Sequence, residues 1–301
     1  MERRHGALAC ATDPRRWDMT AISVVVPAHD EEGLIRSTLR SLHDATRGSI
    51  DIVVVANGCQ DATAARAREV DGVRVIEISE ASKIRALNVG NGAVSVSPVA
   101  FVDADVTVRG DDLLELARRM QRDAGIHVAS PRMRVQSSTS WAVRQYYRVW
   151  ALTDYRSAGH IGSGVYMLGA EGRARIGEFP DIVADDTFVQ RMFAPDERLT
   201  PDDLWFEVRA PGSLRALVHR NSRIAAGNRQ LSILFPELAP PSASAGARAL
   251  LGRVWRRPSM WAAFVIYTAV YSAAHRRAGA LARQSDGITW HRDETTRTVP
   301  A

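Results

Sequence analysis

The chain has 301 residues, 46% of them hydrophobic, so it is long and apolar enough to bury a sizeable core and fold as a globular protein. Its 39 basic and 34 acidic residues give a net charge of +5, which suits a phosphate-bearing or anionic-membrane partner, whereas no base-reading module or long basic run indicates nucleic acid. Two cysteines, Cys10 and Cys59, are too few for a secreted disulfide framework and are not spaced to hold zinc, which favours a reducing cytoplasmic location.

The chain begins with charged residues and then gives its first regular pattern. Residues 1–19 lack the apolar stretch of a secretory signal, and we expect a mobile tail there. Residues 22–26 form a β-branched run typical of a strand covered on both faces, which Pro27 is expected to end. The stretch EEGLIRSTLRSL then places apolar residues near helical spacing behind an acidic start, so the sequence predicts a first strand-loop-helix unit.

The same unit repeats in the following segment. Strands are predicted at 50–55, 73–78 and 99–102, with helices at 62–70 and 83–94 between them. Strands that alternate with helices through short connections predict an α/β fold, with a mostly parallel sheet and helices on both faces. In such sheets ligands bind at the carboxyl ends of the strands, where the polar clusters AHDEE, NGCQD and DAD all fall.

The DAD cluster places Asp103 and Asp105 directly after the strand at 99–102. Alternate side chains of an extended segment share a face, so we expect both carboxylates to point the same way. Two like charges held together need a cation, and oxygen ligands suit Mg²⁺ or Mn²⁺ next to a substrate phosphate. The plain alternative is a solvated turn, which aspartate also favours.

Residues 111–120 are then predicted as a helix capped by Asp111 or Asp112, and residues 127–135 as a strand. A long aromatic helix is predicted at 137–155. Five of its side chains would either line an acceptor groove or, as is more common at this spacing, pack in the core: Trp141, Arg144, Tyr147, Arg148 and Trp150.

A second acidic pair follows a glycine-containing strand, GSGVYMLGA, whose glycines would let the backbone approach a ligand closely. Asp185 and Asp186 open a helix with Phe188 and Val189 on its apolar side. Simple helix capping, worth about 1 kcal/mol, would explain an acidic start without any chemistry.

The C-terminal part changes in composition. Residues 236–257 are predicted as a Pro/Ala/Ser-rich linker followed by a basic segment, and residues 258–301 as an apolar helix and a disordered tail. The apolar stretch Met260–Ala274 is shorter than the roughly 20 residues of a membrane span and is bracketed by arginines. It is either a helix packed on the main domain or a membrane-surface helix with four aromatic residues near the headgroups: Trp255, Trp261, Tyr267 and Tyr271.

In order and spacing, the segments SVVVPAHDEE, VVVANGCQDAT, SKIRALNVG, FVDADV and GSGVYMLGAEGRARIGEFPDIVADDTFVQRM resemble the family 2 glycosyltransferases of the GT-A fold. The resemblance runs from about Ser23 to Met192 and implies a catalytic domain at residues 20–235. It also implies an inverting, metal-dependent transfer of a sugar from a nucleotide-sugar donor to a hydroxyl acceptor.

The resemblance further implies a role for each matching residue. Asp186 corresponds to the family's catalytic base, which deprotonates the acceptor, and Asp185 replaces a glutamate. Asp105 is the implied metal ligand, and His219, in a region where related enzymes often have a mobile loop, is a second candidate. Contacts to the nucleotide sugar are implied for eight residues: Pro27, His29, Glu31, Asn57, Lys83, Asp103, Ala104 and Arg220.

Two positions depart from the family pattern. Asn57 stands where a carboxylate often accepts the imide proton of uracil, so the nucleotide is not assigned, and the neighbouring Cys59 is expected to be a turn residue. Ser82 replaces a usual glycine before Lys83, which is the chain's only lysine. No P-loop, kinase or short-chain dehydrogenase motif can be built around this lysine. The alternatives are a sugar-phosphate nucleotidyltransferase and a non-catalytic sugar-nucleotide-binding or membrane scaffold protein.

Overall fold

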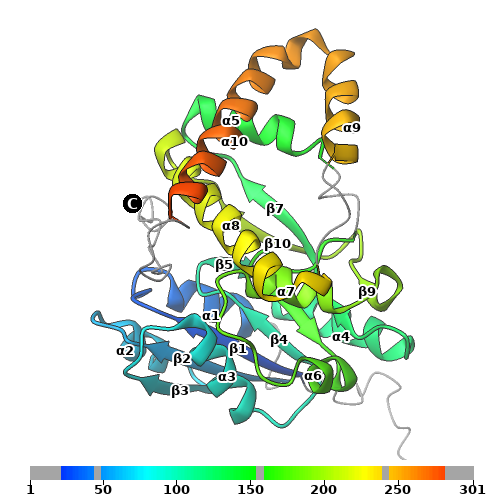
Figure 1. Cartoon of the computed structure of the whole chain (residues 1–301). Coiled ribbons are helices and arrows are strands. Elements are labelled where there is room, and N and C mark those ends of the chain that lie inside the picture. Colours follow the sequence, from blue (N-terminus) through cyan, green and yellow to red (C-terminus); the bar gives the residue numbers. More distant parts are fainter. Residues whose placement is uncertain (1–21, 44–48, 154–158, 239–243, 282–301) are drawn as a thin grey trace, which may run out of the picture.

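The computed structural model describes residues 22–43, 49–153, 159–238 and 244–281. The N-terminal tail expected at residues 1–19 and the C-terminal tail expected from Ser285 onward therefore lie outside the described residues. Figure 1 shows the described part as two sheets with their covering helices, joined to a helical layer that extends away from them.

Seven strands form the central sheet, in the order β3-β2-β1-β4-β8-β6-β9. β1 pairs in parallel with β2 and β4, whereas β8 is antiparallel to both β4 and β6. The predicted mostly parallel sheet is thus confirmed, with β8 running against its neighbours. The strand bounds are β1 Ile22–Ala28, β2 Ile50–Asn57, β3 Val73–Ile78, β4 Val99–Val102, β6 Val128–Ala129, β8 Val165–Leu168 and β9 Arg198–Leu199.

Apolar side chains cover both faces of this sheet. Val24 and Val26 of β1 belong to a core cluster with α1 (Ile35–His43) and α4 (Gly110–Arg122), while Val25 points into a second cluster with α3 (Lys83–Ala93) and α7 (Asp185–Met192). The continuous apolar run of β1 is therefore explained by burial on both faces. Two further helices flank the sheet, α2 (Thr63–Arg68) and α6 (Ala170–Ile176). A smaller sheet consists of β5 (Val106–Val108), β10 (Trp205–Arg209) and β7 (Arg132–Gln136), in that order.

β1 does not end at Pro27, as the sequence predicted, but continues to Ala28. The amide of Ser23 donates to Pro98 on the β4 side, and residues two apart in a strand point the same way, so the nitrogen of Pro27 faces that side as well. The pairing between β1 and β4 stops at Val25. Because β4 does not pair with β1 at Pro27, the missing N–H of this proline costs the sheet no hydrogen bond.

Two other local predictions are corrected. The single strand predicted at 127–135 is divided by Pro131 into β6 of the central sheet and β7 (Arg132–Gln136) of the smaller sheet, which also contains β5 (Val106–Val108) and β10 (Trp205–Arg209). The N-cap of α4 is Arg109, so Asp111 and Asp112 lie in the first turn of the helix rather than at its cap. There their charge still favours the positive end of the helix dipole.

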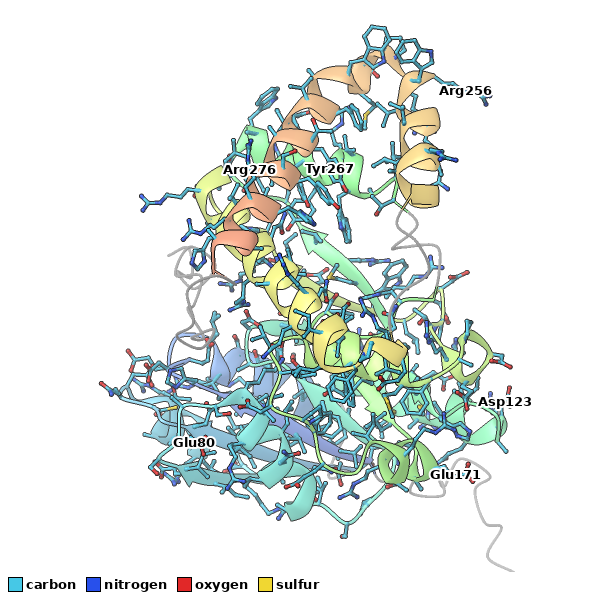
Figure 2. The ribbon with its side chains drawn as sticks, in the orientation of Figure 1. Glu80, Asp123, Glu171, Arg256, Tyr267 and Arg276 are labelled. Carbon is cyan, nitrogen blue, oxygen red and sulfur yellow. The ribbon has the colours of Figure 1, made fainter. Side chains whose placement is uncertain are left out.

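The helical layer is built from α5 (Trp141–Trp150), α8 (Leu214–Leu234), α9 (Ser244–Trp255) and α10 (Trp261–Leu281). α10 packs on α5 and α8 through buried Val143, Tyr146, Leu217 and Val270, and the rings of Tyr146 and Tyr267 stack at 5.1 Å. Figure 2 labels Tyr267 within this layer and Arg256 near its far end. The aromatic residues of α5 thus serve mainly as packing, and only Trp141, at 58% exposure, remains largely in solvent.

α9 and α10 change the expected layout of the C-terminal part. The segment expected as a linker and basic stretch contains a helix of twelve residues, and the apolar helix is longer than the stretch Met260–Ala274. Short 3-10 turns lie at Pro195–Glu197, Pro236–Leu238 and Pro258–Met260. In the described ranges, no helix combines the length and apolar character required to cross a bilayer.

Candidate functional site

Lys83 lies at the centre of the candidate site, at the first residue of α3. Ser82 caps this helix, its side chain accepting a hydrogen bond of 3.2 Å from the amide of Arg85. The Nζ atom of Lys83 lies 2.9 Å from Oδ1 of Asp103 and 3.1 Å from Oδ1 of Asp185. One ammonium thus bridges the two acidic motifs of the sequence.

Asp103 and Asp105 lie in a turn rather than in the extended segment that was predicted. β4 ends at Val102, the amide of Val106 donates to the carbonyl of Asp103, and β5 then continues in the smaller sheet. The two carboxylates consequently differ in environment: that of Asp103 faces Lys83, whereas Asp105 is exposed. The buried Ala104 between them accepts a hydrogen bond from Thr38 through its carbonyl oxygen.

Burial and the bridge act together on the pKa values of all three groups. Burial alone would lower the pKa of Lys83, but the carboxylates of Asp103 and Asp185 outweigh it and raise that pKa above its ordinary value. Burial raises the pKa of Asp103 to about 6, against the opposing effect of Lys83 and with help from the charges of Asp185 and Asp105. Burial likewise raises the pKa of Asp185. Two carboxylates therefore share one cation that remains protonated.

The acidic pair that opens α7 divides into two different environments. Asp185 is only 3% exposed and is committed to Lys83, so it is poorly placed to reach an acceptor. Asp186 is partly exposed, and its two oxygens accept from the amides of Ser163, at 3.0 Å, and Thr187, at 2.7 Å. Ala184 rather than either aspartate is the N-cap of the helix, so capping does not account for the pair.

The Gly162-Ser163-Gly164 turn contacts both motifs, although the sequence placed it in the strand GSGVYMLGA, which begins only at Val165. All three residues have positive φ angles, and a Cβ atom at Gly162 would lie 2.6 Å from the Cβ of Asp186. A Cβ at Gly164 would approach Asp103, whose amide donates to the carbonyl of Gly164 at 2.8 Å. The close approach requires glycine at both positions and holds Asp103 and Asp186 against one turn.

His160 was missed by sequence reasoning because an isolated histidine carries no spacing signal. Its Nε2 lies 3.0 Å from the hydroxyl of Ser163, and burial lowers its pKa to about 4, although the charge of Asp186 opposes this shift. The ring is therefore neutral near pH 7. It adds a polar contact next to Asp186 without adding a second positive charge.

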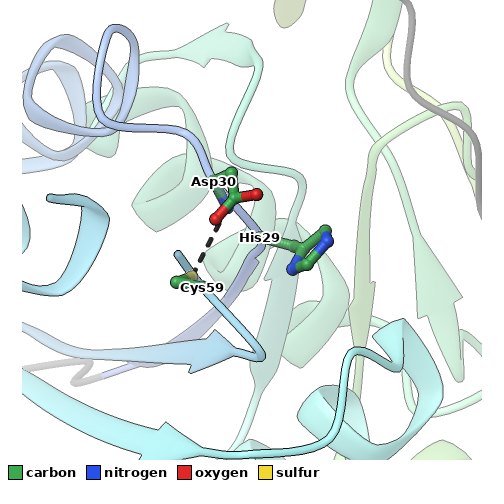
Figure 3. A group of neighbouring side chains, drawn as sticks. All are labelled: His29, Asp30 and Cys59. Carbon is green, nitrogen blue, oxygen red and sulfur yellow. Dashed lines mark hydrogen bonds between the residues drawn. The ribbon is translucent and has the colours of Figure 1, made fainter. Parts of the chain in front are cut away.

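Hydrogen bonds join the loops that follow β1 and β2. His29 donates through Nδ1 to the carbonyl of Asn57 at 2.5 Å, and the amide of Asp30 donates to the sulfur of Cys59 (Figure 3). The amide of Glu31, whose side chain is 5% exposed, donates to the hydroxyl of Thr63. These contacts make the two loops a single rim beside the buried Pro27.

His29, Asp30 and Cys59 form the group of three adjacent potential metal ligands found among the described residues. Their ligand atoms already serve the backbone, since Asp30 also accepts from the amide of Gln60 and Cys59 donates to Ala28. Burial raises the pKa of the Cys59 thiol, which disfavours the thiolate that a metal needs. The group therefore fits a turn-locking role, as expected for Cys59.

Asn57 does not face solvent, although the resemblance implied that it contacts the nucleotide sugar. It is fully buried, and its Nδ2 donates to the carbonyl of Ala28 at 2.9 Å. A shallow pocket of about 400 Å³ lies instead over the ends of β2 and β3, lined by Ala56, Gly58, Cys59, Gln60, Glu77, Ile78 and Ser79. Gln60 belongs to the NGCQD cluster that the sequence placed at a strand end, whereas Glu77 and Ser79 lie in no motif of the sequence and were not predicted.

His219 and Arg220 lie on the helix α8. The resemblance had instead implied a mobile loop in this region. α8 is a continuous helix of 21 residues, capped by Ser213 and packed against α10. Within the described ranges, no set of three potential ligand atoms within 4.8 Å includes His219 together with Asp105. Arg220 lies close enough to Tyr146 of α5 for its charge to oppose the raised pKa of that phenol.

We expect Lys83→Met to lower the free energy of unfolding by about 3 kcal/mol, because the buried Asp185 carboxylate would lose its counter-charge. Urea unfolding at pH 7 measures this. Arg85→Met, which removes a cation from an exposed pair with Glu80, should change stability by about 0.5 kcal/mol at most. Asp185→Asn added to Lys83→Met should restore part of the loss. Equal effects of the two single substitutions would contradict the bridging role.

Comparisons with known proteins agree on the fold. The chain is similar to the mannosyltransferase PcManGT from Pyrobaculum calidifontis, solved with GDP-Man and Mn²⁺, with a TM-score of 0.57 and 21% identity over 87% of this chain and 78% of that one. It is also similar to glucosyl-3-phosphoglycerate synthase from Mycobacterium tuberculosis, solved with Mn²⁺ and UDP-Glc, with a TM-score of 0.53 and 21% identity over 74% and 80% of the two chains. No curated protein matches the chain.

The sheet order, the helical coverage and these neighbours show that the chain has the GT-A fold. Residues 23–168 match the model of glycosyl transferase family 2. This match covers 146 of the 301 residues, ends at the last residue of β8 and is to the family that the motif order had indicated.

Proposed function

We propose that the protein transfers a sugar, with inversion, from a nucleotide-sugar donor to a hydroxyl acceptor in a metal-dependent reaction. The observation that supports this most strongly is that the four aspartates of the site lie in different environments. Asp186 is partly exposed and fixed by two amides, Asp105 is exposed at the end of β4, and Asp103 and Asp185 are joined by Lys83. A single-displacement transfer needs one base and one charged group at the leaving phosphate.

The base in this proposal is Asp186. Amides from Ser163 and Thr187 hold its carboxylate in one orientation, and each carboxylate oxygen keeps further acceptor capacity for an incoming hydroxyl. As the acceptor oxygen attacks the anomeric carbon, its proton passes to Asp186, and the bond to the diphosphate breaks on the opposite face. Asp185 does not act as a second base in this proposal, because its carboxylate is paired with Lys83.

The residues around Asp105 fit a divalent cation. The side chain is an exposed oxygen donor, and none of the ion pairs or hydrogen bonds found in the described ranges engages its carboxylate. Asp103 next to it is a second carboxylate, held in place by Lys83. Bound Mg²⁺ or Mn²⁺ would neutralise charge on the leaving diphosphate. Related folds solved with Mn²⁺ or Mg²⁺ are in keeping with this choice.

The donor would lie across the rim made by the loops after β1 and β2. The pocket over the ends of β2 and β3 offers the side-chain carboxamide of Gln60, the carboxylate of Glu77, which also pairs with Arg68, and the hydroxyl of Ser79. Together these groups can donate to or accept from a nucleobase. Carboxyl ends of parallel strands are the usual ligand site of such sheets. We propose a cytoplasmic enzyme that is attached peripherally to the inner face of a membrane and acts on a hydroxyl acceptor.

A donor and product assay tests this function. Thermal shift with UDP-glucose and GDP-mannose, each with Mn²⁺, should raise the melting temperature for at least one donor, since a ligand at about 100 times its Kd adds roughly 2.7 kcal/mol. That donor should then yield a nucleoside diphosphate with a hydroxyl acceptor such as glycerol 3-phosphate, mannose or extracted lipid. Pyrophosphate release from a sugar phosphate and a nucleoside triphosphate would instead identify a nucleotidyltransferase. Donor binding without turnover on any acceptor would favour a non-catalytic protein.

A further inference from the structure

The positive charge of the chain is concentrated in its C-terminal helices. Between Leu238 and Leu281 the sequence has six arginines and no aspartate or glutamate, while the rest of the chain has 33 basic and 34 acidic residues. The excess of +5 therefore comes from this segment alone. A segment that is uniformly basic while the remaining chain is nearly neutral has a charge pattern complementary to an anionic surface.

The turn between α9 and α10 combines this charge with exposed apolar side chains. Leu251 is 50% exposed, Trp255 is 70% exposed, Trp261 is 49% exposed and Val265 is 65% exposed. The two indole rings stack on each other at 5.7 Å with an interplanar angle of 29°. Arg256 and Arg257 lie between them in the sequence and are both exposed. We call these six residues the turn surface.

Packing inside the protein does not explain the turn surface. The inward sides of α9 and α10 are occupied by a separate cluster in which Val254, Met260 and Ala263 are buried against Val149 of α5. Tyr267, which the sequence placed among headgroup-facing aromatics, stacks on Tyr146 and is therefore part of that packing. The outward residues could be polar without cost to these contacts. Figure 2 shows Arg256 at the end of the helical layer that lies away from the two sheets.

We propose that the turn surface docks on an anionic phospholipid membrane, with Trp255 and Trp261 at the level of the headgroups and Arg256 and Arg257 against lipid phosphates. Tryptophan side chains are favoured at bilayer interfaces, and arginine side chains near an anionic leaflet are attracted to its lipid phosphates. This surface deepens the proposed peripheral attachment and rests on it. Its position on the turn, rather than along the whole of α10, leaves the packing on α5 and α8 intact.

Vesicle co-sedimentation of the full chain tests the proposal without any catalytic readout. We expect binding to vesicles of 30% phosphatidylglycerol in phosphatidylcholine, weak binding to pure phosphatidylcholine, and loss of binding in high salt. Arg256→Gln with Arg257→Gln should weaken binding at least about tenfold, as expected for two arginines at an anionic leaflet. Trp255→Ser with Trp261→Ser should weaken it to a similar degree.

Matched variants separate docking from general charge. Arg276→Gln with Arg277→Gln makes the same charge change at the other end of α10, and we expect a change of less than about threefold. Ile233→Ser with Leu234→Ser removes exposed apolar side chains from α8 and should leave binding unchanged. Equal losses in both arginine pairs would overturn the proposal in favour of diffuse attraction. Binding to heparin but not to the anionic vesicles would assign the surface to another polyanion.

A failed vesicle experiment would leave the proposed sugar transfer untouched. Nucleoside diphosphate release with a water-soluble acceptor depends on Asp105 and Asp186, neither of which lies in the turn surface. Melting temperatures of all four double variants should stay close to that of the unmodified protein, because the substituted side chains are exposed. A large drop in melting temperature for the tryptophan pair would show that the stacked indoles serve the fold, and would count against docking.

Discussion

Asp186→Asn is expected to lower kcat by roughly 10²- to 10⁴-fold while donor affinity holds, because a general base acts mainly in the transition state. Asparagine has nearly the size of aspartate, and its amide oxygen can still accept from Ser163 or Thr187, so the local structure should persist. Release of nucleoside diphosphate in the presence of a working acceptor measures kcat. Calorimetric titration with the donor measures affinity.

Asp181→Asn provides the matched control for this experiment. Asp181 is exposed in the same segment, four residues before Asp185, and its substitution should leave both kcat and stability nearly unchanged. If Asp186→Asn turned over at a near-normal rate and lost only stability, Asp186 would be a structural residue. Asp185 would be a poor substitute for it as the base, because it is buried and bound to Lys83.

Asp105→Ala is expected to remove the Mn²⁺-dependent part of donor affinity, a loss of at least about tenfold, because few protein ligands hold the cation beside the diphosphate. Stability should change little, since Asp105 is exposed and takes part in none of the ion pairs found in the described ranges. Titration with the donor in the presence of Mn²⁺, and again with EDTA, separates the metal-dependent part from the rest.

Asp71→Ala removes an exposed aspartate from another turn and serves as the control for charge alone. It should bind the donor as the unmodified protein does, with and without Mn²⁺. Unchanged Mn²⁺-dependent affinity in Asp105→Ala, for every donor that the unmodified protein binds, would exclude Asp105 from the metal site. Asp103→Asn would then be the next variant to measure, although its effect would combine with loss of the Lys83 bridge.

The position of Lys83 explains why a single lysine occurs in an arginine-rich chain. Its compact ammonium contacts two carboxylates from separate motifs at 2.9 Å and 3.1 Å, whereas a planar guanidinium favours bidentate contacts with one. The bridge also connects α7, which carries Asp185 and Asp186, to the end of β4. The resemblance placed Lys83 near the nucleotide. The structure adds that Lys83 bonds to Asp185, which lies 102 residues away in the chain.

The sequence by itself determined the alternating strands and helices and the positions of Asp103, Asp105 and Asp186 at strand and helix ends. Those features follow from periods of two and 3.6 residues and from short motifs, which are local and therefore legible in one chain. The errors at Pro27 and at residues 127–135 arose where the outcome depended on which neighbouring strand was present.

Only the tertiary structure decided how the acidic residues divide their roles. Asp185 and Asp186 are adjacent and chemically identical in sequence. Asp185 is nevertheless buried against Lys83, whereas Asp186 is partly exposed and accepts a hydrogen bond from the amide of Ser163. α10 similarly packs one side on α5 and α8 and leaves Trp261 and Val265 exposed on the other. Both outcomes depend on contacts between segments that lie far apart in the chain, and the energy of such contacts is set by packing and burial, which no local pattern encodes.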